Sequence, residues 1–308
     1  MLGRIVEIEG EGRRLSLHRG FLEIAGPDGR LGQVPLDDIE AVILSNPAAS
    51  FTSQVVAALA QRGVPFVICG PDFRPVAYLL PIDGHHAQGN RMEAQAEVSL
   101  PTRKRLWAEI VKVKIAAQGA ALERCGVNDG PVSCLVSRVR SGDADNLEAQ
   151  AAQRYFPLLF GPDFNRTREA GGINGLLNYG YTVLRAATAR AVVAAGLNPS
   201  LALFHRSRGD SLRLADDLME PFRPSVDLIA FEYARSHGGE LDTGAKRRLA
   251  GVLHADFETS EGVTPLSNVL ARLATSLAQI FLNERKSLNL PIKLVPILEN
   301  DSHQMEGN

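Results

Sequence analysis

The segment "LADDLMEPFRP" (214–224) places three carboxylates, Asp216, Asp217 and Glu220, within five residues. Like charges this close repel one another, so the cluster needs either open solvent or a cation. One explanation is the N-terminus of a helix, where negative charge is favoured. The other is a divalent metal ion. On a helical turn, Asp217 and Glu220 would share a face. Two prolines, Pro221 and Pro224, predict that a helix here is short or kinked.

Glu148 is a second candidate for the same chemistry. Apolar or aromatic residues follow it at i+4, i+7 and i+11, namely Ala152, Tyr155 and Leu159. In a helix this stripe would turn Glu148 toward the core, where a carboxylate needs a partner. The alternative is a capping box, with Asp145 at the N-cap and Glu148 three positions later.

His205 ends the run "GLNPSLALFH" and is followed closely by Arg206 and Arg208. A lone histidine beside an apolar segment is usually structural. Taken with the two acidic segments, however, it completes a set of oxygen ligands and one imidazole, which suits Mg²⁺ or Mn²⁺ better than zinc. Such a cation can activate an attacking oxygen at a phosphorus centre, and the arginines could hold phosphate oxygens.

The composition predicts a two-domain protein that is neither strongly basic nor disordered. Of its 308 residues 45% are hydrophobic, and its net charge is -2, with a pI near 6.4. The three cysteines cannot all pair within one chain, and the charged N-terminus lacks the apolar core of a signal peptide. No apolar run reaches the ~20 residues of a membrane span. We therefore expect a cytoplasmic protein without a membrane partner.

The elements that must position these residues change character along the chain. Alternating segments such as "RIVEIEG" and "VPFVICG" predict strands, and "FTSQVVAALAQRG" predicts one helix among them. Beyond the polar segment "IDGHHAQGN" the hydrophobic period becomes helical. The expected class is α+β: a small β-domain with one helix over residues 1–82, a linker over 83–92, an all-α catalytic domain over 93–298 and a polar tail over 299–308.

Several ordered phrases resemble a known family. They are "LSLHRGFLEI" and "VPLDDIEAVILSNP" in the first half, and "LLNYGY", "GLNPSLALFH" and "DLMEPFRP" in the second. Together they resemble the CRISPR-associated spacer-acquisition integrase, the first-numbered Cas protein, in the form that accompanies type II systems. The resemblance covers nearly the whole chain, and its most specific part is the ordered set in the second half.

The resemblance implies a metal site and a reaction. Glu148, His205 and Glu220 would be the catalytic and metal-binding residues, with Asp217 as an additional ligand and Mg²⁺ or Mn²⁺ as the cofactor. Whether Asp217 or Glu220 is the principal third ligand stays open at this point. The implied reaction is transesterification, in which the 3′-OH of captured DNA attacks a repeat end of a CRISPR array and inserts a spacer.

The resemblance also implies partners: DNA from the protospacer and the repeat, a second copy of the chain and the small second Cas protein, with the type II effector nuclease as a further candidate. Candidates for backbone contacts are Arg206, Arg208 and Arg223, and the basic helix that contains Arg103, Lys104, Arg105, Lys112 and Lys114. The alternative for that helix, and for the cluster at 246–248, is a solvated face. A nuclease of branched DNA that does not join ends, or a non-catalytic DNA-binding scaffold, are the competing functions.

Overall fold

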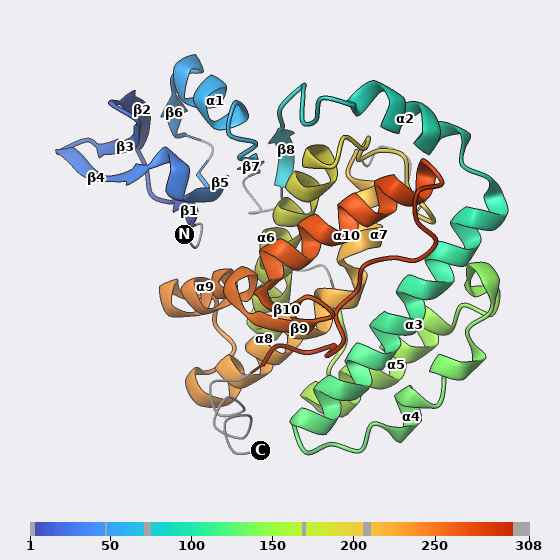
Figure 1. Ribbon diagram of the computed structural model, residues 1–308. Coiled ribbons are helices and arrows are strands. Elements are labelled where there is room, and N and C mark those ends of the chain that lie inside the picture. Colours follow the sequence, from blue (N-terminus) through green and yellow to red (C-terminus); the bar gives the residue numbers. More distant parts are fainter. Residues whose placement is uncertain (1–3, 47, 71–74, 168–170, 206–210, 298–308) are drawn as a thin grey trace.

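The computed structural model describes residues 4–46, 48–70, 75–167, 171–205 and 211–297, and Figure 1 shows two parts of different character. Strands dominate the first part and helices the second, which confirms the predicted α+β class. None of the described helices is long and apolar enough to cross a membrane.

The N-terminal part contains two four-stranded sheets. The first has the order β1-β5-β7-β8 and is parallel except for the β7–β8 pair. The second has the order β4-β3-β2-β6. The strands are β1 (Arg4–Ile8), β2 (Arg14–His18), β3 (Phe21–Gly26), β4 (Gly29–Pro35), β5 (Ile39–Leu44), β6 (Ser50–Phe51), β7 (Phe66–Cys69) and β8 (Pro75–Leu79).

One α-helix, α1 (Ser53–Ala60), lies in this part, as the sequence predicts. Thr52 caps it by accepting a hydrogen bond from the Val55 amide. Every residue of the central strand β5 is buried. Such a strand reads as a continuous apolar run because both of its faces are covered.

The second part consists mainly of helices around α6 (Gly172–Ala194), which contacts α7, α8, α9 and α10. The long α3 (Leu100–Arg124) runs beside α5. The remaining helices are α2 (Gln88–Glu97), α4 (Gly130–Ser133), α5 (Leu147–Phe160), α7 (Arg213–Met219), α8 (Arg223–His237), α9 (Thr243–Ala250) and α10 (Leu266–Phe281), with 3-10 turns η1 (Leu36–Asp38), η2 (Val136–Arg138), η3 (Ser141–Asp143), η4 (Glu220–Phe222) and η5 (Gly251–His254).

Two details differ from the sequence-based expectation. The second part is not purely helical, because β9 (Asp256–Thr259) and β10 (Gly262–Pro265) form an antiparallel hairpin. Gly262 has φ 105 at the turn, a conformation that favours glycine. In addition, α2 begins at Gln88, within the segment predicted as a linker. Short strands without a clear alternating pattern are hard to separate from loops by periodicity.

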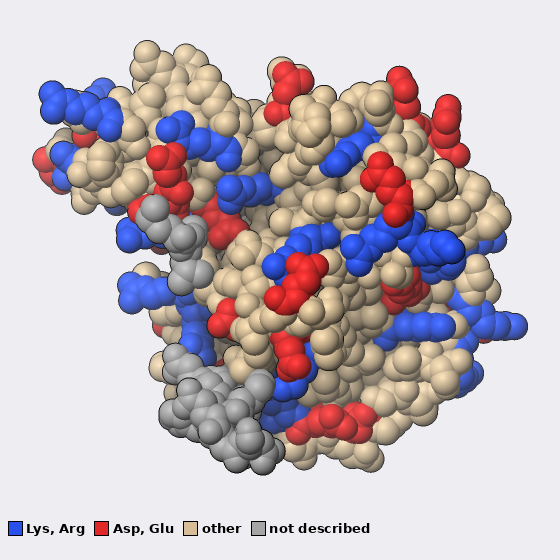
Figure 2. All heavy atoms as spheres, in the orientation of Figure 1, with Lys and Arg blue, Asp and Glu red and all other residues tan. Residues whose placement is uncertain are grey.

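The surface agrees with the near-zero net charge. On the face of the molecule shown in Figure 2, Lys and Arg side chains are interspersed with Asp and Glu and form no continuous basic patch. A strong general attraction for nucleic acid is therefore not a property of this face, and any DNA contact must depend on local groups.

Candidate metal and DNA site

The segment that begins at Leu214 is not one continuous helix but the end of a short helix, a 3-10 turn and the start of another helix. α7 ends at Met219, η4 covers Glu220–Phe222, and α8 begins at Arg223. This break at Pro221 confirms the predicted interruption. It also sends the carboxylates in different directions. Asp216 forms an ion pair with Arg185, with 2.6 Å between Oδ1 and Nε, while Asp217 and Glu220 are both buried.

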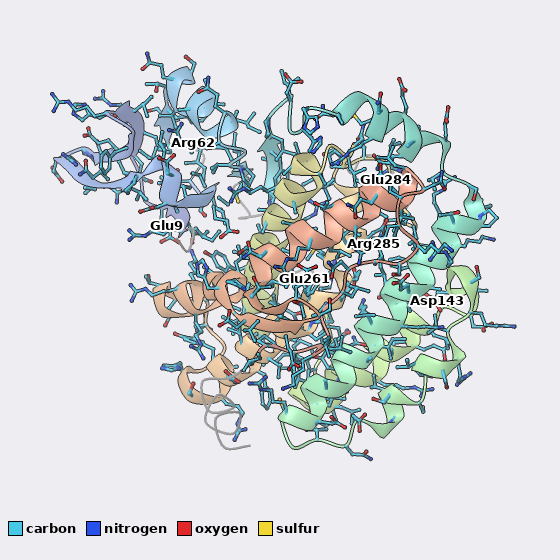
Figure 3. The ribbon with its side chains drawn as sticks, viewed as in Figure 1. Glu9, Arg62, Asp143, Glu261, Glu284 and Arg285 are labelled. Carbon is cyan, nitrogen blue, oxygen red and sulfur yellow. The ribbon has the colours of Figure 1, made fainter. Side chains whose placement is uncertain are left out.

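Glu148 lies in the first turn of α5, but the predicted capping box does not form. The N-cap residue is Asn146, in a left-handed conformation with φ 53. The cap itself comes from Asp143, whose carboxylate accepts hydrogen bonds from the amides of Leu147 at 2.9 Å and Glu148 at 3.0 Å. Asp143 lies close to α3 in Figure 3. The Glu148 carboxylate is therefore not used in capping and faces α3.

Lys114 joins the two acidic segments. Its ammonium group donates a hydrogen bond to Oε1 of Glu148 and lies 2.5 Å from Oε2 of Glu220. The sequence assigned Lys114 to a surface that binds DNA or faces solvent, and this was wrong, because the residue is buried. The signal was available: Lys114 follows Trp107, Ile110 and Val111 at helical spacing, and those three residues are also buried.

Arg223 supplies a second positive charge. Its Nε lies 3.0 Å from Oε1 of Glu220, and its guanidinium lies over the ring of Tyr181. Burial raises the pKa of Glu220, but Arg223 and Lys114 together lower it below its usual range. Glu220 is therefore held as a carboxylate between two cations.

His205 is oriented by Asp217. The Nδ1 atom of His205 lies 2.6 Å from Oδ1 of Asp217. The Asp217 carboxylate also accepts hydrogen bonds from the amides of Leu203 at 2.6 Å, Phe204 at 3.1 Å and His205 at 3.2 Å. Hydrogen bonding to Asp217 raises the pKa of His205 despite its partial burial. Since Nδ1 is engaged, Nε2 is the ring nitrogen left for a ligand.

An aromatic cluster fixes the loop that carries His205. The rings of Trp107 and Phe204 stack with centroids 4.5 Å apart. Trp107 also contacts the edge of His205 at 5.7 Å. Because Trp107 and Lys114 both belong to α3, this one helix supports the histidine and both glutamates. Sequence reasoning identified neither Trp107 nor Asp143 as part of the site.

The side chains fit a hard divalent cation. Glu148 and Glu220 offer carboxylate oxygens and His205 offers a neutral nitrogen, the donor types that Mg²⁺ and Mn²⁺ accept. The buried Oε2 of Glu220 receives no well-aligned hydrogen bond from the described residues. In the described part of the chain no three acidic, histidine or cysteine side chains are close enough to hold a metal ion together. The ammonium group of Lys114 lies between the two glutamates.

The residues of the site differ in their exposure to solvent. The side chains of Lys114 and Glu220 are 8% and 5% exposed, whereas those of Glu148 and His205 are 27% and 37% exposed. A substrate can therefore approach Glu148 and His205, with Lys114 and Glu220 behind them.

The predicted DNA-contacting residues have different surroundings. Arg103 lines a cavity next to His205. Lys104 packs over Gly142. Arg105 is exposed and lies 3.8 Å from Glu109. Arg223 belongs to the buried cluster around Glu220. Arg206 and Arg208 lie outside the described residues.

Two carboxylates and an imidazole are donor types used in metal-dependent phosphoryl transfer. The model of the family described as CRISPR associated protein Cas1 matches residues 6–256. The chain is 37% identical to the CRISPR-associated endonuclease Cas1 of Neisseria meningitidis serogroup C, over 94% of this chain and 95% of that protein. It is also 25% identical to a CRISPR-associated endonuclease Cas1 of Pyrobaculum aerophilum, over 87% and 96%. The chain belongs to the Cas1 family.

Solved structures share the fold. A casposase bound to integration product superposes with a TM-score of 0.81 at 19% identity, over 99% of this chain and 98% of that chain. A CAS1 protein from Thermotoga maritima gives 0.73 at 15% identity, over 92% and 99%. At these identities the similarity concerns the fold. It confirms that the mixed arrangement of strands and helices is that of Cas1 and casposase proteins.

Proposed function

We propose that this protein is a divalent-metal-dependent DNA integrase and endonuclease that inserts spacer DNA into a CRISPR array. In the proposed reaction the 3′-OH of the incoming strand attacks a phosphodiester at the end of a repeat. The P–O bond to the new strand forms as the P–O bond to the old strand breaks, and the released strand keeps a 3′-OH. Exchanging one phosphodiester for another requires no external energy source.

The observation that carries the proposal is that one helix, α3, contacts all three residues: Lys114 lies between Glu148 and Glu220, and Trp107 packs against His205. We assign these three as the ligands of Mg²⁺ or Mn²⁺. When bound, such a cation lowers the pKa of an attacking hydroxyl and neutralises charge at phosphorus. Asp217 becomes a positioning residue in this assignment, because the imidazole and three amides already occupy its carboxylate.

The chain's own groups have separate tasks in this proposal. Asp217 holds the His205 ring so that Nε2 points away from it, and the stacked Trp107 and Phe204 limit movement of the loop. Arg223 keeps Glu220 ionised, so that the carboxylate can serve as a ligand at neutral pH. Contacts to the sugar–phosphate backbone would give little sequence preference for the spacer.

The proposed partners are DNA, a second copy of the chain and the small second Cas protein, with the type II effector nuclease as a further candidate. Support comes from the family and from a solved Cas6-RT-Cas1–Cas2 complex, whose fold matches 94% of this chain with a TM-score of 0.72 at 20% identity, although it covers only 36% of that longer chain.

A strand-joining assay tests the proposal. The protein and its small partner are mixed with a labelled duplex bearing free 3′-OH ends, a supercoiled plasmid carrying the matching repeat, and Mg²⁺ or Mn²⁺. We expect label to enter the plasmid with the wild type and with Glu123→Gln, an exposed change on α3. Glu148→Gln should abolish the transfer.

Two other outcomes of this assay would assign a different function to the protein. Shortened strands without joined product would identify a plain nuclease, since the same three ligands can serve hydrolysis. Equal activity of the complexes formed by the wild type and by Glu148→Gln would identify a non-catalytic scaffold. Mn²⁺ binding measured by electron paramagnetic resonance separates these cases from a variant that merely misfolds.

A further inference from the structure

A cavity of about 170 Å³ lies directly beside His205, and no residue assigned to the metal site except His205 lines it. Its wall is formed by the end of α2, the start of α3, the loop at 200–205, the first residue of α7 and the last residue of α10. One water molecule needs only ~10–15 Å³ of such space. The cavity can therefore hold a larger group than a single solvent molecule.

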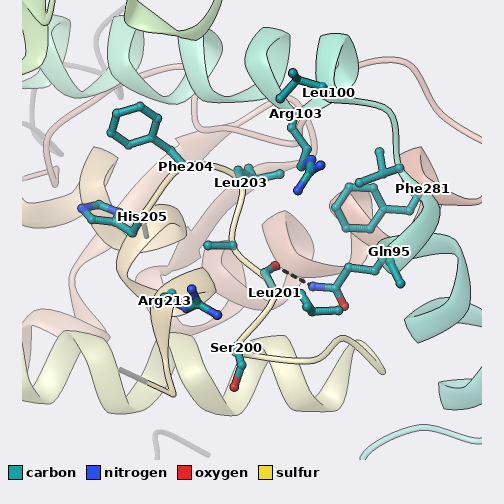
Figure 4. A pocket seen from close by; sticks show the side chains of 13 residues that line it. Gln95, Leu100, Arg103, Ser200, Leu201, Leu203, Phe204, His205, Arg213 and Phe281 are labelled. Carbon is teal, nitrogen blue, oxygen red and sulfur yellow. Dashed lines mark hydrogen bonds between the residues drawn. The ribbon is translucent and has the colours of Figure 1, made fainter. Parts of the chain in front are cut away.

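Two arginines line this cavity from different elements. Figure 4 shows Arg103, from α3, and Arg213, from the start of α7, reaching toward the loop at 200–205 from two sides. The Nε atom of each is buried and has no hydrogen-bond acceptor among the described residues. Neither guanidinium forms an ion pair with a carboxylate in the described part of the chain.

Several other arginines of this protein have acceptors within the chain. Arg185 pairs with Asp216, and Arg91 donates a hydrogen bond to the carbonyl of Ala195 at 2.9 Å. A buried donor without an acceptor is destabilising, because it loses hydration without replacement. An anion in the cavity would supply an acceptor to the buried Nε atoms of Arg103 and Arg213.

The wall between the two arginines is rigidly held. The side-chain amide of Gln95 donates hydrogen bonds to the carbonyls of Asn198 at 3.0 Å and Leu201 at 2.9 Å. Its oxygen accepts a hydrogen bond from the Asn198 amide at 2.8 Å. These bonds fix the loop and engage both ends of the Gln95 amide. The bond to Leu201 is drawn in Figure 4.

We propose that this cavity binds one phosphate group of a DNA strand, next to the position where the reaction takes place. Arg103 and Arg213 would both donate hydrogen bonds to the oxygens of that phosphate, the acceptor geometry that guanidinium groups match best. Apolar side chains such as Leu201 and Phe204 leave room for the attached sugar rather than for a second charge. The proposal rests on the proposed function, because it takes DNA as the substrate.

The test measures DNA affinity as a function of salt, without divalent metal so that no chemistry takes place. The probe is a labelled duplex with a single-stranded 3′ overhang, bound to the wild type, Arg103→Gln, Arg213→Gln and the double variant. The matched control is Arg138→Gln, at an exposed position of η2 outside the cavity. Each phosphate neutralised on a single strand contributes about 0.7 to the slope of log K against log salt.

We expect the double variant to lower the slope by roughly 0.7, the contribution of one phosphate. Each single variant should bind more weakly but lower the slope by less, because the remaining arginine still neutralises the same phosphate. Arg103→Lys, which keeps the charge, should retain most of the slope but bind more weakly. Arg138→Gln should leave the slope unchanged. Circular dichroism confirms that each variant is folded.

Two results would overturn the proposal: a slope for the double variant that matches Arg138→Gln, or a loss of roughly 0.7 in each single variant that adds to twice this value in the double variant. The first would mean that the cavity binds no phosphate, and the second that the arginines contact different phosphates. The strand-joining assay is read separately. If the wild type joins strands but the cavity variants keep its slope, only the proposed phosphate site is refuted. If the cavity variants lower the slope but the wild type joins no strands, only the proposed integrase reaction is refuted.

Discussion

Two lysines in this protein each lie between two glutamates, in very different surroundings. Lys114 contacts Glu148 and Glu220 inside the helical part. Lys246, on α9, contacts Glu7 and Glu9 of the N-terminal part, and its Nζ lies 3.1 Å from Oε1 of Glu7. Glu9 lies on the side of the N-terminal part that faces α9 (Figure 3). Both clusters therefore consist of one ammonium group and two carboxylates.

The difference between them is access to water. The side chain of Glu9 is 47% exposed, whereas that of Glu220 is 5% exposed. Exposed ion pairs contribute little because water and salt screen them. A buried pair contributes little net stability when intact, but removing one partner leaves an unpaired charge and costs far more. A second cation, such as a metal ion, would therefore change stability most in the cluster around Lys114.

The largest expected effect is that of Lys114→Met. Removal of the ammonium group leaves two carboxylates close together, and the free energy of unfolding should fall by roughly 3–5 kcal/mol in metal-free buffer. Mg²⁺ should restore more stability to the variant than to the wild type, because the cation would neutralise the same carboxylates. Urea denaturation with and without Mg²⁺ measures both quantities.

Lys112→Met is the matched control for this change. Lys112 is exposed on the same helix, so its replacement should change the free energy of unfolding by less than about 0.5 kcal/mol. Equal losses from both variants would mean that the buried cluster does not behave differently from the surface of α3.

Another buried carboxylate, Asp227, has tyrosine and arginine neighbours and provides a pH test. Burial raises the pKa of Asp227 to about 6, although the hydrogen bond from Tyr181 and the charges of Arg166 and Arg223 oppose this. Its ordinary value is 3.8. Because the folded-state pKa is raised, the contribution to stability is full below pH ~4 and is lost as the pH rises through about 6.

The loss corresponds to roughly 3 kcal/mol between these two pH values. Denaturation of the wild type and Asp227→Asn at several pH values measures it. The advantage of the wild type over Asp227→Asn should shrink as the pH rises from about 4 to about 7. A constant difference would show that Asp227 is ionised throughout this range.

Asp217→Asn tests the positioning role in the metal site. The amide nitrogen cannot accept the bonds that the carboxylate accepts from the His205 ring and from the loop amides. We expect Mn²⁺ binding to weaken by about 10–100-fold, the usual consequence of losing a group that orients a metal ligand. Electron paramagnetic resonance measures the free Mn²⁺. Asp163→Asn, at an exposed position, should leave the affinity unchanged.

An affinity for Mn²⁺ in Asp217→Asn equal to that of the wild type would show that His205 does not need Asp217 for metal binding. Complete loss of binding in a folded variant would instead favour Asp217 as a direct ligand. The measurement therefore distinguishes the two roles that the sequence left open.

The smallest expected effect is that of Lys246→Met. The surrounding carboxylates remain partly hydrated, so the free energy of unfolding should fall by less than about 1 kcal/mol. This loss should shrink further as NaCl rises, whereas the loss in Lys114→Met should depend little on salt. A loss in Lys246→Met as large as in Lys114→Met would contradict the comparison between the two clusters.

The amino-acid sequence by itself determined the fold class, the change from strands to helices, the break at Pro221 and the three segments that carry Glu148, His205 and Glu220. These features follow from local periodicity, from proline geometry and from the spacing of charged residues. The sequence also identified the family from the ordered phrases of its second half.

Only the tertiary structure decided how these residues are partnered. Lys114, 34 residues from Glu148, becomes a neighbour of both glutamates because α3 packs against α5 and η4. Asp217 and Glu220 are three residues apart, yet one supports a histidine and the other faces two cations. A local pattern fixes which face of a helix is buried, but the charges opposite that face come from distant segments, and burial sets the strength of their interaction.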